Sequence, residues 1–318
     1  MSTKAKAISE KSYKRMPVGR MLYQNKTLIF MCLPAIIFFF IFSYMPMPGM
    51  YIAFVKYNYT QGIFGSPFVG LKNFTFLFTS GQLGLLLKNT VLYNLAFIII
   101  GNVLQLFIAI LLNEVQSKVF KKTTQSLMFL PYFISDVLVS LLVYNLLNYD
   151  YGFISNLVRN LGGEMPKVYQ IKEAWPYIIV LVNIWKGTGY GTVVYFAAIT
   201  GMDTSMLEAA QIDGANGFQK IRYIILPTLR PTVVILFLFA IGGILKGNFG
   251  LFYNLVGNNT VLQSTTDIIE TYVYRAMMNN FNFAQSSAVG LFQSVVGFFI
   301  VLGANAFAKK LDPDYALF

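Results

Sequence analysis

The feature that most constrains this chain is a series of six long apolar runs separated by more polar segments. A helix of roughly 20 apolar residues spans the hydrocarbon core of a bilayer. Hydrophobic residues make up 56% of the chain and charged residues 12%, and soluble domains carry about twice that charged share. We therefore predict an all-α polytopic membrane protein with six transmembrane helices. The predicted spans are Thr27–Met47, Asn89–Leu112, Thr124–Leu147, Trp175–Ile199, Thr232–Phe252 and Ser286–Ala308.

The basic residues indicate how the chain is oriented. Lys and Arg gather before the first span, between spans two and three, between spans four and five, and after span six. Short cytoplasmic segments carry such an excess, and an even number of spans places both termini on one side. We predict a multi-pass protein of the cell membrane with both termini in the cytoplasm. Its parts are a basic segment at 1–26, a six-span domain at 27–308 and a tail at 309–318.

Several kinds of chemistry are excluded by what the sequence lacks. There is no histidine, and the single cysteine, Cys32, excludes an internal disulfide. Cys32 lies in an apolar run, where we expect it to be a small buried hydrophobic residue. The net charge of +11 is divided among loops rather than gathered in a patch with interleaved aromatic residues, so nucleic acid is not an expected partner. We predict no catalytic residue, no metal site and no bound cofactor.

The segment 201–231 is too long and too patterned for a plain connection between spans four and five. Asp203, Thr204 or Ser205 can cap the start of a helix, and Ser205 with Glu208 three residues later has the spacing of a capping box. Gly214 is expected to end this short helix, because glycine accepts the left-handed conformation there. A second amphipathic helix, Phe218–Leu226, is expected to break or kink at Pro227, which follows it.

Two surfaces could receive the first of these short helices. Its paired alanines, Ala209 and Ala210, allow close approach to a groove in a partner protein. Alternatively, the helix could lie on the lipid surface, where a more apolar and more basic composition is usual. The acidic and amide side chains of Glu208, Gln211 and Asp213 favour the partner protein.

The same segment resembles a known motif. Glu208-Ala209-Ala210, three residues, Gly214, nine residues and then Ile224-x-Leu226-Pro227 is similar to the EAA loop of permease subunits in binding-protein-dependent ABC importers. The resemblance implies that the first helix of 201–231 is a coupling helix that docks on a cytosolic ATPase. The residues to which it assigns this role are Glu208, Ala209, Ala210, Asp213, Gly214, Ala215, Leu226 and Pro227.

Further segments resemble one branch of this family. Phe68-x-Gly70-x-x-Asn73-Phe74 and Lys88-Asn89-Thr90 are similar to the first external segment of carbohydrate permeases of the maltose-transporter type. The segments 267–274 and 288–293 are similar to the branch for complex sugars and polysaccharides. The chain lacks the extra spans and large external domain of some maltose-type permeases.

This resemblance implies a non-catalytic pore subunit that imports an oligosaccharide or another complex sugar. The implied partners are a second homologous permease, two cytosolic ATPases that bind the ATP and Mg²⁺, and an extracellular sugar-binding protein. The sequence contains no GxxxxGK[ST] motif of its own.

Polar groups inside the predicted spans are candidates for the substrate path, because such groups usually face protein or water. The candidates are Asp136, Asn183, Trp185, Lys186, Tyr190, Asn248 and Gln293. Aromatic rings and amide or charged groups together suit sugar binding. A purely structural role is the alternative. In it, Asp136 and Lys186 form an ion pair and the amides bond across helices.

Other functions remain open at this stage. An importer of amino acids or peptides would use the same loop. An ion-coupled secondary transporter could use Asp136, but it would be expected to show internal repeats, which the sequence lacks. An intramembrane enzyme would lack the usual catalytic groups.

Overall fold

The computed structural model describes residues 23–311, and within this range the chain is helical, with one isolated β-bridge between Val55 and Phe68. The all-α prediction is therefore confirmed for this part of the chain. The chain divides into two compact units, 1–51 and 52–318. Most of the predicted basic segment at 1–26 and most of the predicted tail at 309–318 lie outside the described residues.

The first unit contains a long apolar helix that buries none of its residues. α2 (Lys26–Phe39) continues as the π-helical turn η2 (Phe40–Tyr44), and the 3₁₀ helix η3 (Met47–Phe54) follows across the boundary of the unit. The expectation that Cys32 is buried was wrong, since its side chain is exposed on α2. A helix that is apolar all round is suited to lipid or to another subunit, so its residues need no partner within the unit.

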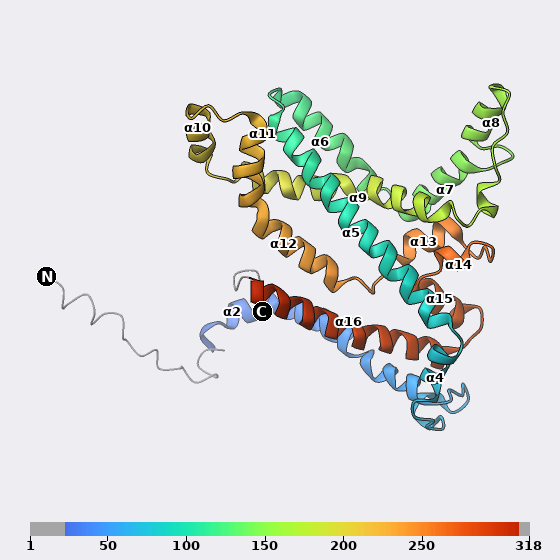
Figure 1. The fold of residues 1–318 in the computed structure, drawn as a ribbon. Coiled ribbons are helices and arrows are strands. Elements are labelled where there is room, and N and C mark those ends of the chain that lie inside the picture. The colour runs from blue at the N-terminus through green and yellow to red at the C-terminus, as the bar shows by residue number, and fades with distance from the viewer. Residues whose placement is uncertain (1–22, 312–318) are drawn as a thin grey trace, which may run out of the picture. The chain divides into compact units, whose positions relative to one another are not determined.

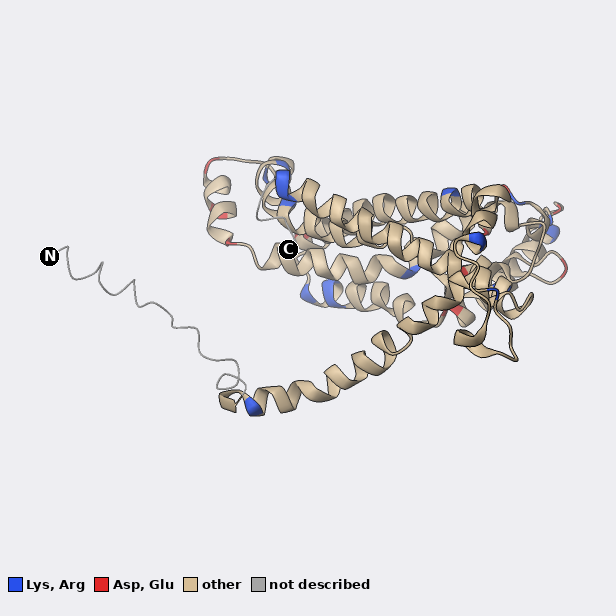
Figure 2. Cartoon of the chain, turned by 90° about the horizontal axis from the view of Figure 1, so that it is seen from below, with Lys and Arg blue, Asp and Glu red and all other residues tan. Residues whose placement is uncertain are grey.

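The second unit is built around long helices that run side by side (Figure 1). In chain order its helices are α3 (Gly62–Gly65), α4 (Lys72–Thr79), α5 (Gln82–Glu114), α6 (Lys118–Phe133), α7 (Asp136–Leu147), α8 (Phe153–Asn160), η4 (Val168–Gln170), α9 (Trp175–Thr200), α10 (Thr204–Ile212), α11 (Gly217–Lys220), η5 (Ile221–Ile225), α12 (Leu226–Gly242), α13 (Phe249–Val256), α14 (Gln263–Thr266), α15 (Ile269–Met278) and α16 (Phe283–Leu311). Charged residues lie mainly toward the two ends of this bundle, and few lie in its middle (Figure 2).

Four helical stretches of the described residues are long and apolar enough to cross a membrane, namely Lys26–Phe54, Gln82–Glu114, Gly217–Gly242 and Phe283–Lys310. A bent pair, α6 with α7, would make a fifth. α9 has 26 residues and matches the fourth predicted span, but Asn183, Lys186 and its glycines dilute its apolar character. The predicted number of six spans therefore remains a prediction.

The third predicted span, Thr124–Leu147, was wrong as a single helix. α6 ends at Phe133 and α7 begins at Asp136, and their axes differ by 97°. Two local signals explain the bend. Pro131 lies in the last turn of α6, and Ser135 caps α7 by accepting a hydrogen bond from the Leu138 amide at 3.4 Å.

The fifth predicted span, Thr232–Phe252, also differs from the structure. The helix begins much earlier, because α11, η5 and α12 form one helical run from Gly217 to Gly242. It then stops, and residues 243–248 are not helical before α13 begins at Phe249. Glycines at 242, 243 and 247 weaken the helix at this place. We call residues 243–248 the broken segment.

Pro227 does not end a helix, so of the two predicted outcomes, a break or a kink, the break is wrong. It lies in the first turn of α12, directly after the π-helical turn η5. Proline lacks an amide hydrogen and its ring presses on the carbonyl one turn earlier. A wider π turn at that point removes the need for the missing bond, so the helix continues.

Helix α9 lies against α5 and α6 at glycine positions. A Cβ on Gly189 would lie 2.0 Å from the carbonyl oxygen of Met128 in α6. A Cβ on Gly191 would lie 2.0 Å from the side-chain oxygen of Gln105 in α5. Small residues at helix crossings let backbones approach closely in membrane bundles. The glycines that dilute the apolar character of α9 therefore position it in the bundle.

Candidate coupling and translocation sites

The start of α10 is held by an aspartate rather than by the predicted capping box. The Asp203 carboxylate accepts a hydrogen bond from the Ser205 amide at 2.9 Å, and Asp203 is the N-cap. Hydrogen bonds from Ser205 hold the pKa of Asp203 below its usual value. Of the three predicted caps the structure therefore confirms Asp203, and the Ser205–Glu208 capping box does not form, because Asp203 already accepts the free amide at this end.

The end of α10 has the geometry that the sequence predicted. Gly214 has a φ of +80°, the left-handed conformation that glycine accepts without strain. The Gly214 amide donates to the Gln211 carbonyl at 3.1 Å, and the Ala215 amide donates to the Ala210 carbonyl at 2.9 Å. These two bonds form a Schellman motif, which fixes where the helix stops.

α10 is exposed on most of its surface, and none of its residues is buried. Met206 is 53% exposed and Ile212 is 87% exposed. Glu208 is exposed too and makes no hydrogen bond or ion pair within the described part of the chain. Leu207 is the contact with the bundle, since it packs against the buried cluster that contains Ile225 and Leu229. The helix thus presents apolar side chains and a free carboxylate to its surroundings.

A hollow of about 350 Å³ lies between α10 and the start of the next helical run. Its lining residues are Ala210, Asp213, Gly214, Ala215, Gln219, Tyr223 and Ile224. Four of the predicted coupling residues are among them. Glu208 and Ala209 are exposed outside the hollow, while Leu226 and Pro227 belong to the first turn of α12.

Sequence reasoning missed the polar contacts that join the two short helices. Asn216 and Gln219 form the capping box that begins α11, with bonds of 2.9 Å and 2.8 Å. The Lys220 ammonium donates to the Gln211 side-chain oxygen at 3.2 Å. The signal was available, because Asn followed three residues later by Gln is a capping pattern. These bonds hold α10 and α11 in a defined relation.

The broken segment is held by side chains from three other helices. Asn94 of α5 donates to the Ile244 carbonyl at 2.8 Å and the Lys246 carbonyl at 3.3 Å. Gln293 of α16 donates to the Leu245 carbonyl at 2.5 Å. Backbone groups without helical partners are tolerated inside a membrane only when other groups satisfy them. The break in α12–α13 is therefore a built feature of the fold.

Glu270 of α15 completes this network, and the sequence analysis did not single it out as a site residue. Its Oε1 atom accepts from the Gly247 amide at 2.8 Å and from Gln293 at 2.7 Å. A Cβ on Gly247 would lie 2.5 Å from the other carboxylate oxygen, so a side chain there would have to displace the Glu270 carboxylate. Glu270 lies within the segment 267–274 that resembles the complex-sugar branch, but its partners lie 23 residues away on both sides of it, so the sequence did not indicate its contacts.

Asp136 and Lys186 form an ion pair next to the broken segment, as the structural alternative predicted. Asp136 is the first residue of α7, and its second carboxylate oxygen lies against Gly250, where a Cβ would be 2.5 Å away. Asn248 caps α13 by accepting from the Leu251 amide at 3.1 Å. The ion pair and the broken segment are thus neighbours.

These polar groups share one depth in the bundle. Asn94, Lys186 and Gln293 lie 12, 11 and 10 residues from the starts of α5, α9 and α16, or about 15–18 Å at 1.5 Å per residue. All three helices start at the same end of the bundle, opposite α10 (Figure 1). We call the set the polar layer; its members are Asn94, Asp136, Lys186, Asn248, Glu270 and Gln293.

Three predicted substrate-path residues, Asn183, Trp185 and Tyr190, are not part of the polar layer. Asn183 is half-buried on α9, three residues before Lys186. Trp185 is 44% exposed and lines an apolar cavity of about 470 Å³ with Leu181 and Pro131. Tyr190 stacks on Tyr132, with ring centroids 4.9 Å apart. The structure therefore brings together four of the seven candidates: Asp136, Lys186, Asn248 and Gln293.

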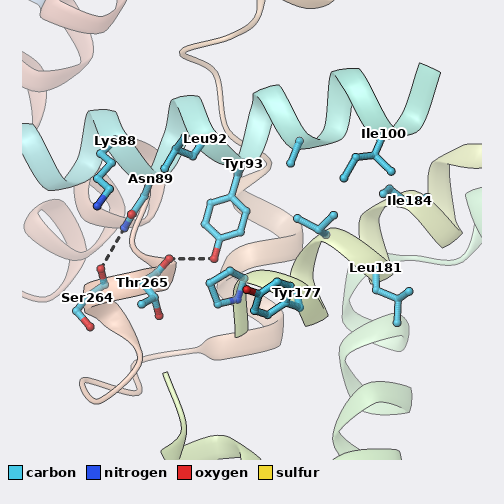
Figure 3. A pocket seen from close by; sticks show the side chains of 13 residues that line it. Lys88, Asn89, Leu92, Tyr93, Ile100, Tyr177, Leu181, Ile184, Ser264 and Thr265 are labelled. Atoms are coloured by element: carbon cyan, nitrogen blue, oxygen red, sulfur yellow. Dashed lines mark hydrogen bonds between the residues drawn. The ribbon is translucent and has the colours of Figure 1, made fainter. Parts of the chain in front are cut away.

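The most spacious groove found, about 680 Å³, lies along α5, α9 and α14, and none of the predicted site residues lines it (Figure 3). Its outer end is closed by hydrogen bonds from Asn89 to the Ser264 carbonyl, at 3.5 Å, and from Tyr93 to the Thr265 carbonyl, at 2.9 Å. Aliphatic side chains line most of the rest. Sugar binding needs several polar groups, so this groove is not the candidate site.

Known proteins resemble this chain over most of its length. It is 38% identical over 308 residues to the polygalacturonan/rhamnogalacturonan transport system permease protein YteP of Bacillus subtilis, covering 97% of this chain and 95% of the relative. It is 34% identical to Protein LplB of the same organism, covering 92% of each.

Solved structures and a family model agree with these relatives. A bacterial ABC transporter involved in the import of the acidic polysaccharide alginate matches with a TM-score of 0.83 and 32% identity, covering 93% of this chain and 99% of that one. A structure of the bacterial alginate ABC transporter in complex with alginate pentasaccharide-bound periplasmic protein matches with a TM-score of 0.82 and 33% identity, covering 92% and 97%. Residues 101–315 match the model of the binding-protein-dependent transport system inner membrane component. The chain therefore belongs to this family of non-catalytic permease subunits of ABC transporters.

Proposed function

We propose that this chain is a translocation subunit of an ATP-driven importer for oligosaccharides, and that α10 couples it to cytosolic ATPases. The exposed α10 carries this proposal. Its two ends are fixed by Asp203 and by the Schellman motif at Gly214, yet its outer surface has no partner within the described chain. A rigid helix with exposed apolar side chains and a free carboxylate suits the groove of a partner protein.

The packing of α10 suggests how movement would reach the substrate path. Leu207 contacts the buried cluster that includes Ile225 and Leu229, at the start of the helical run that ends at Gly242. The broken segment follows directly. Displacement of α10 by ATPase closure would therefore move α12 as a rigid rod and rearrange the polar layer at its far end.

The proposed substrate is an oligosaccharide rich in uronate residues. Two similar proteins support this choice, since the names of one relative and one solved structure refer to polygalacturonan and to the acidic polysaccharide alginate. The polar layer supplies amide, carboxylate and ammonium groups beside aromatic residues. The proposed partners are a second homologous permease, two ATPases that bind ATP and Mg²⁺, and an extracellular sugar-binding protein.

Assembly and transport test this function together. Co-expression with a second permease, the ATPase and the binding protein should yield a complex that contains two ATPase copies. In proteoliposomes it should take up trigalacturonate only when ATP is inside and the binding protein outside. Uptake by this chain alone, or uptake that a proton or sodium gradient drives without ATP, would contradict the proposal.

The proposed orientation places α10 and both termini in the cytoplasm. After Cys32, which is exposed, is replaced by serine, single cysteines at Thr60 and Ser205 give a matched pair, because both positions are exposed in the structure. We expect a membrane-impermeant maleimide to label Thr60→Cys in intact cells and Ser205→Cys only after the cells are opened. The reverse pattern would show that the chain has the opposite orientation.

A further inference from the structure

Lys246 is an exposed cation on the broken segment that has no acidic partner. The ion pairs of the described residues join Lys186 to Asp136 and Arg275 to Asp267, and Lys246 takes part in neither. The nearest carboxylate on the neighbouring elements is Glu270, which contacts the Gly247 amide and Gln293 through Oε1, while its Oε2 atom is buried without a hydrogen-bond partner. Neither oxygen forms an ion pair with the Lys246 ammonium. The ammonium of Lys246 is therefore the free positive charge at this depth of the described bundle.

The backbone around Lys246 is hydrogen-bonded to residues of the polar layer. Its backbone carbonyl accepts from Asn94, and the neighbouring carbonyl of Leu245 accepts from Gln293. Both partners belong to the polar layer, so the segment that carries Lys246 is held against it. An ammonium at such depth faces protein or water rather than hydrocarbon, because exposure to lipid is costly. Lys246 is thus placed beside the proposed substrate path.

An aromatic cluster begins three residues after Lys246. Phe249 and Tyr253 of α13 lie against Tyr274 of α15, and the ring centroids are 4.8–5.1 Å apart. All three residues are half-buried, so part of each ring remains open. Ligand sites in proteins combine aromatic surfaces with a few polar groups that fix orientation and specificity. A sugar ring presents an apolar face and polar edges, which match this combination.

We propose that Lys246 and the aromatic cluster of Phe249, Tyr253 and Tyr274 form a subsite for a uronate residue. The ammonium pairs with the carboxylate, and the sugar ring lies on the aromatic side chains. This inference rests on the proposed sugar-import function. It assigns the importer's selectivity for acidic sugars to Lys246. A neutral sugar leaves the Lys246 ammonium without a carboxylate partner, so we expect the neutral sugar to be imported more slowly than the acidic one.

The test compares trigalacturonate with the same trisaccharide after methyl esterification of its carboxyls. Each is presented to the reconstituted complex with saturating binding protein and ATP, and initial uptake is measured. We expect Lys246→Gln to lower trigalacturonate uptake about tenfold and to leave uptake of the ester close to wild type. Lys246→Arg keeps the positive charge and should retain most uptake of the acid.

Control variants separate selectivity from general effects. Lys88→Gln removes another exposed cation, outside the polar layer, and should change neither uptake. Tyr274→Ala should lower uptake of acid and ester alike, because stacking does not depend on charge. Basal ATP hydrolysis of each variant reports on assembly.

Three results would overturn the subsite. They are equal losses for acid and ester in Lys246→Gln, no loss for either sugar, and a loss in Lys88→Gln as large as that in Lys246→Gln. A wild-type complex that imports neither sugar would instead refute the proposed substrate, and the subsite would fall with it.

Discussion

Replacing Gly189 by alanine should sharply reduce the amount of folded protein. The new Cβ would lie 2.0 Å from the Met128 carbonyl oxygen and 2.4 Å from its carbonyl carbon, both backbone atoms of α6. Neither can move without displacing the helix, and added atoms in a packed interior cost about 1–3 kcal/mol or more. We expect a large fall in the thermal unfolding midpoint of the detergent-solubilised protein and poor recovery of monodisperse material.

Gly187 provides the matched control for this prediction. It lies two residues earlier in α9, and a Cβ there would meet nothing within 4 Å. Alanine favours a helix over glycine by about 1 kcal/mol, so Gly187→Ala should leave the midpoint unchanged or raise it slightly. If Gly189→Ala were as stable as Gly187→Ala, α6 and α9 would not be in backbone contact.

Glu208→Gln should impair coupling while leaving the stability of this chain unchanged. The carboxylate is exposed and makes no bond or ion pair within the described chain, so its removal takes nothing from the local helix. A contact between this charge and a cation or backbone donors of an ATPase would be stronger than its neutral counterpart. We expect sugar-stimulated ATP hydrolysis by the assembled complex to fall about tenfold, which corresponds to a loss of about 1.4 kcal/mol.

Substitutions at the N-terminal end of α10 distinguish a coupling role of Glu208 from a purely local effect on helix stability. Asp203→Ala removes the N-cap itself and should cost α10 about 1 kcal/mol, whereas Ser205→Ala keeps the backbone amide that donates to Asp203 and should cost less. A Glu208→Gln complex that assembles, hydrolyses ATP and transports as the wild type does would show that the charge does not carry coupling.

α10, which we propose as the coupling helix, could be located from the sequence because its signals are local. Gly214 lies within one turn of the helix that it ends, and the φ of +80° requires a residue of its kind. The N-terminal cap was narrowed only to Asp203, Thr204 or Ser205, since all three suit this role and the sequence does not say which side chain turns toward the free amide. The family model, which matches 101–315, includes this segment.

The sequence by itself determined that the chain is helical and apolar, because helix period and span length are read from neighbouring residues. It also identified Asp136 and Lys186 as possible partners, since two opposite charges in apolar runs need each other. Only the tertiary structure decided where α12 stops inside the bundle. α12 ends at Gly242 because Asn94, Glu270 and Gln293, each distant in the chain, satisfy the backbone of the broken segment. A helix can end inside an apolar bundle only where other segments supply hydrogen bonds, and no local pattern records which segments those are.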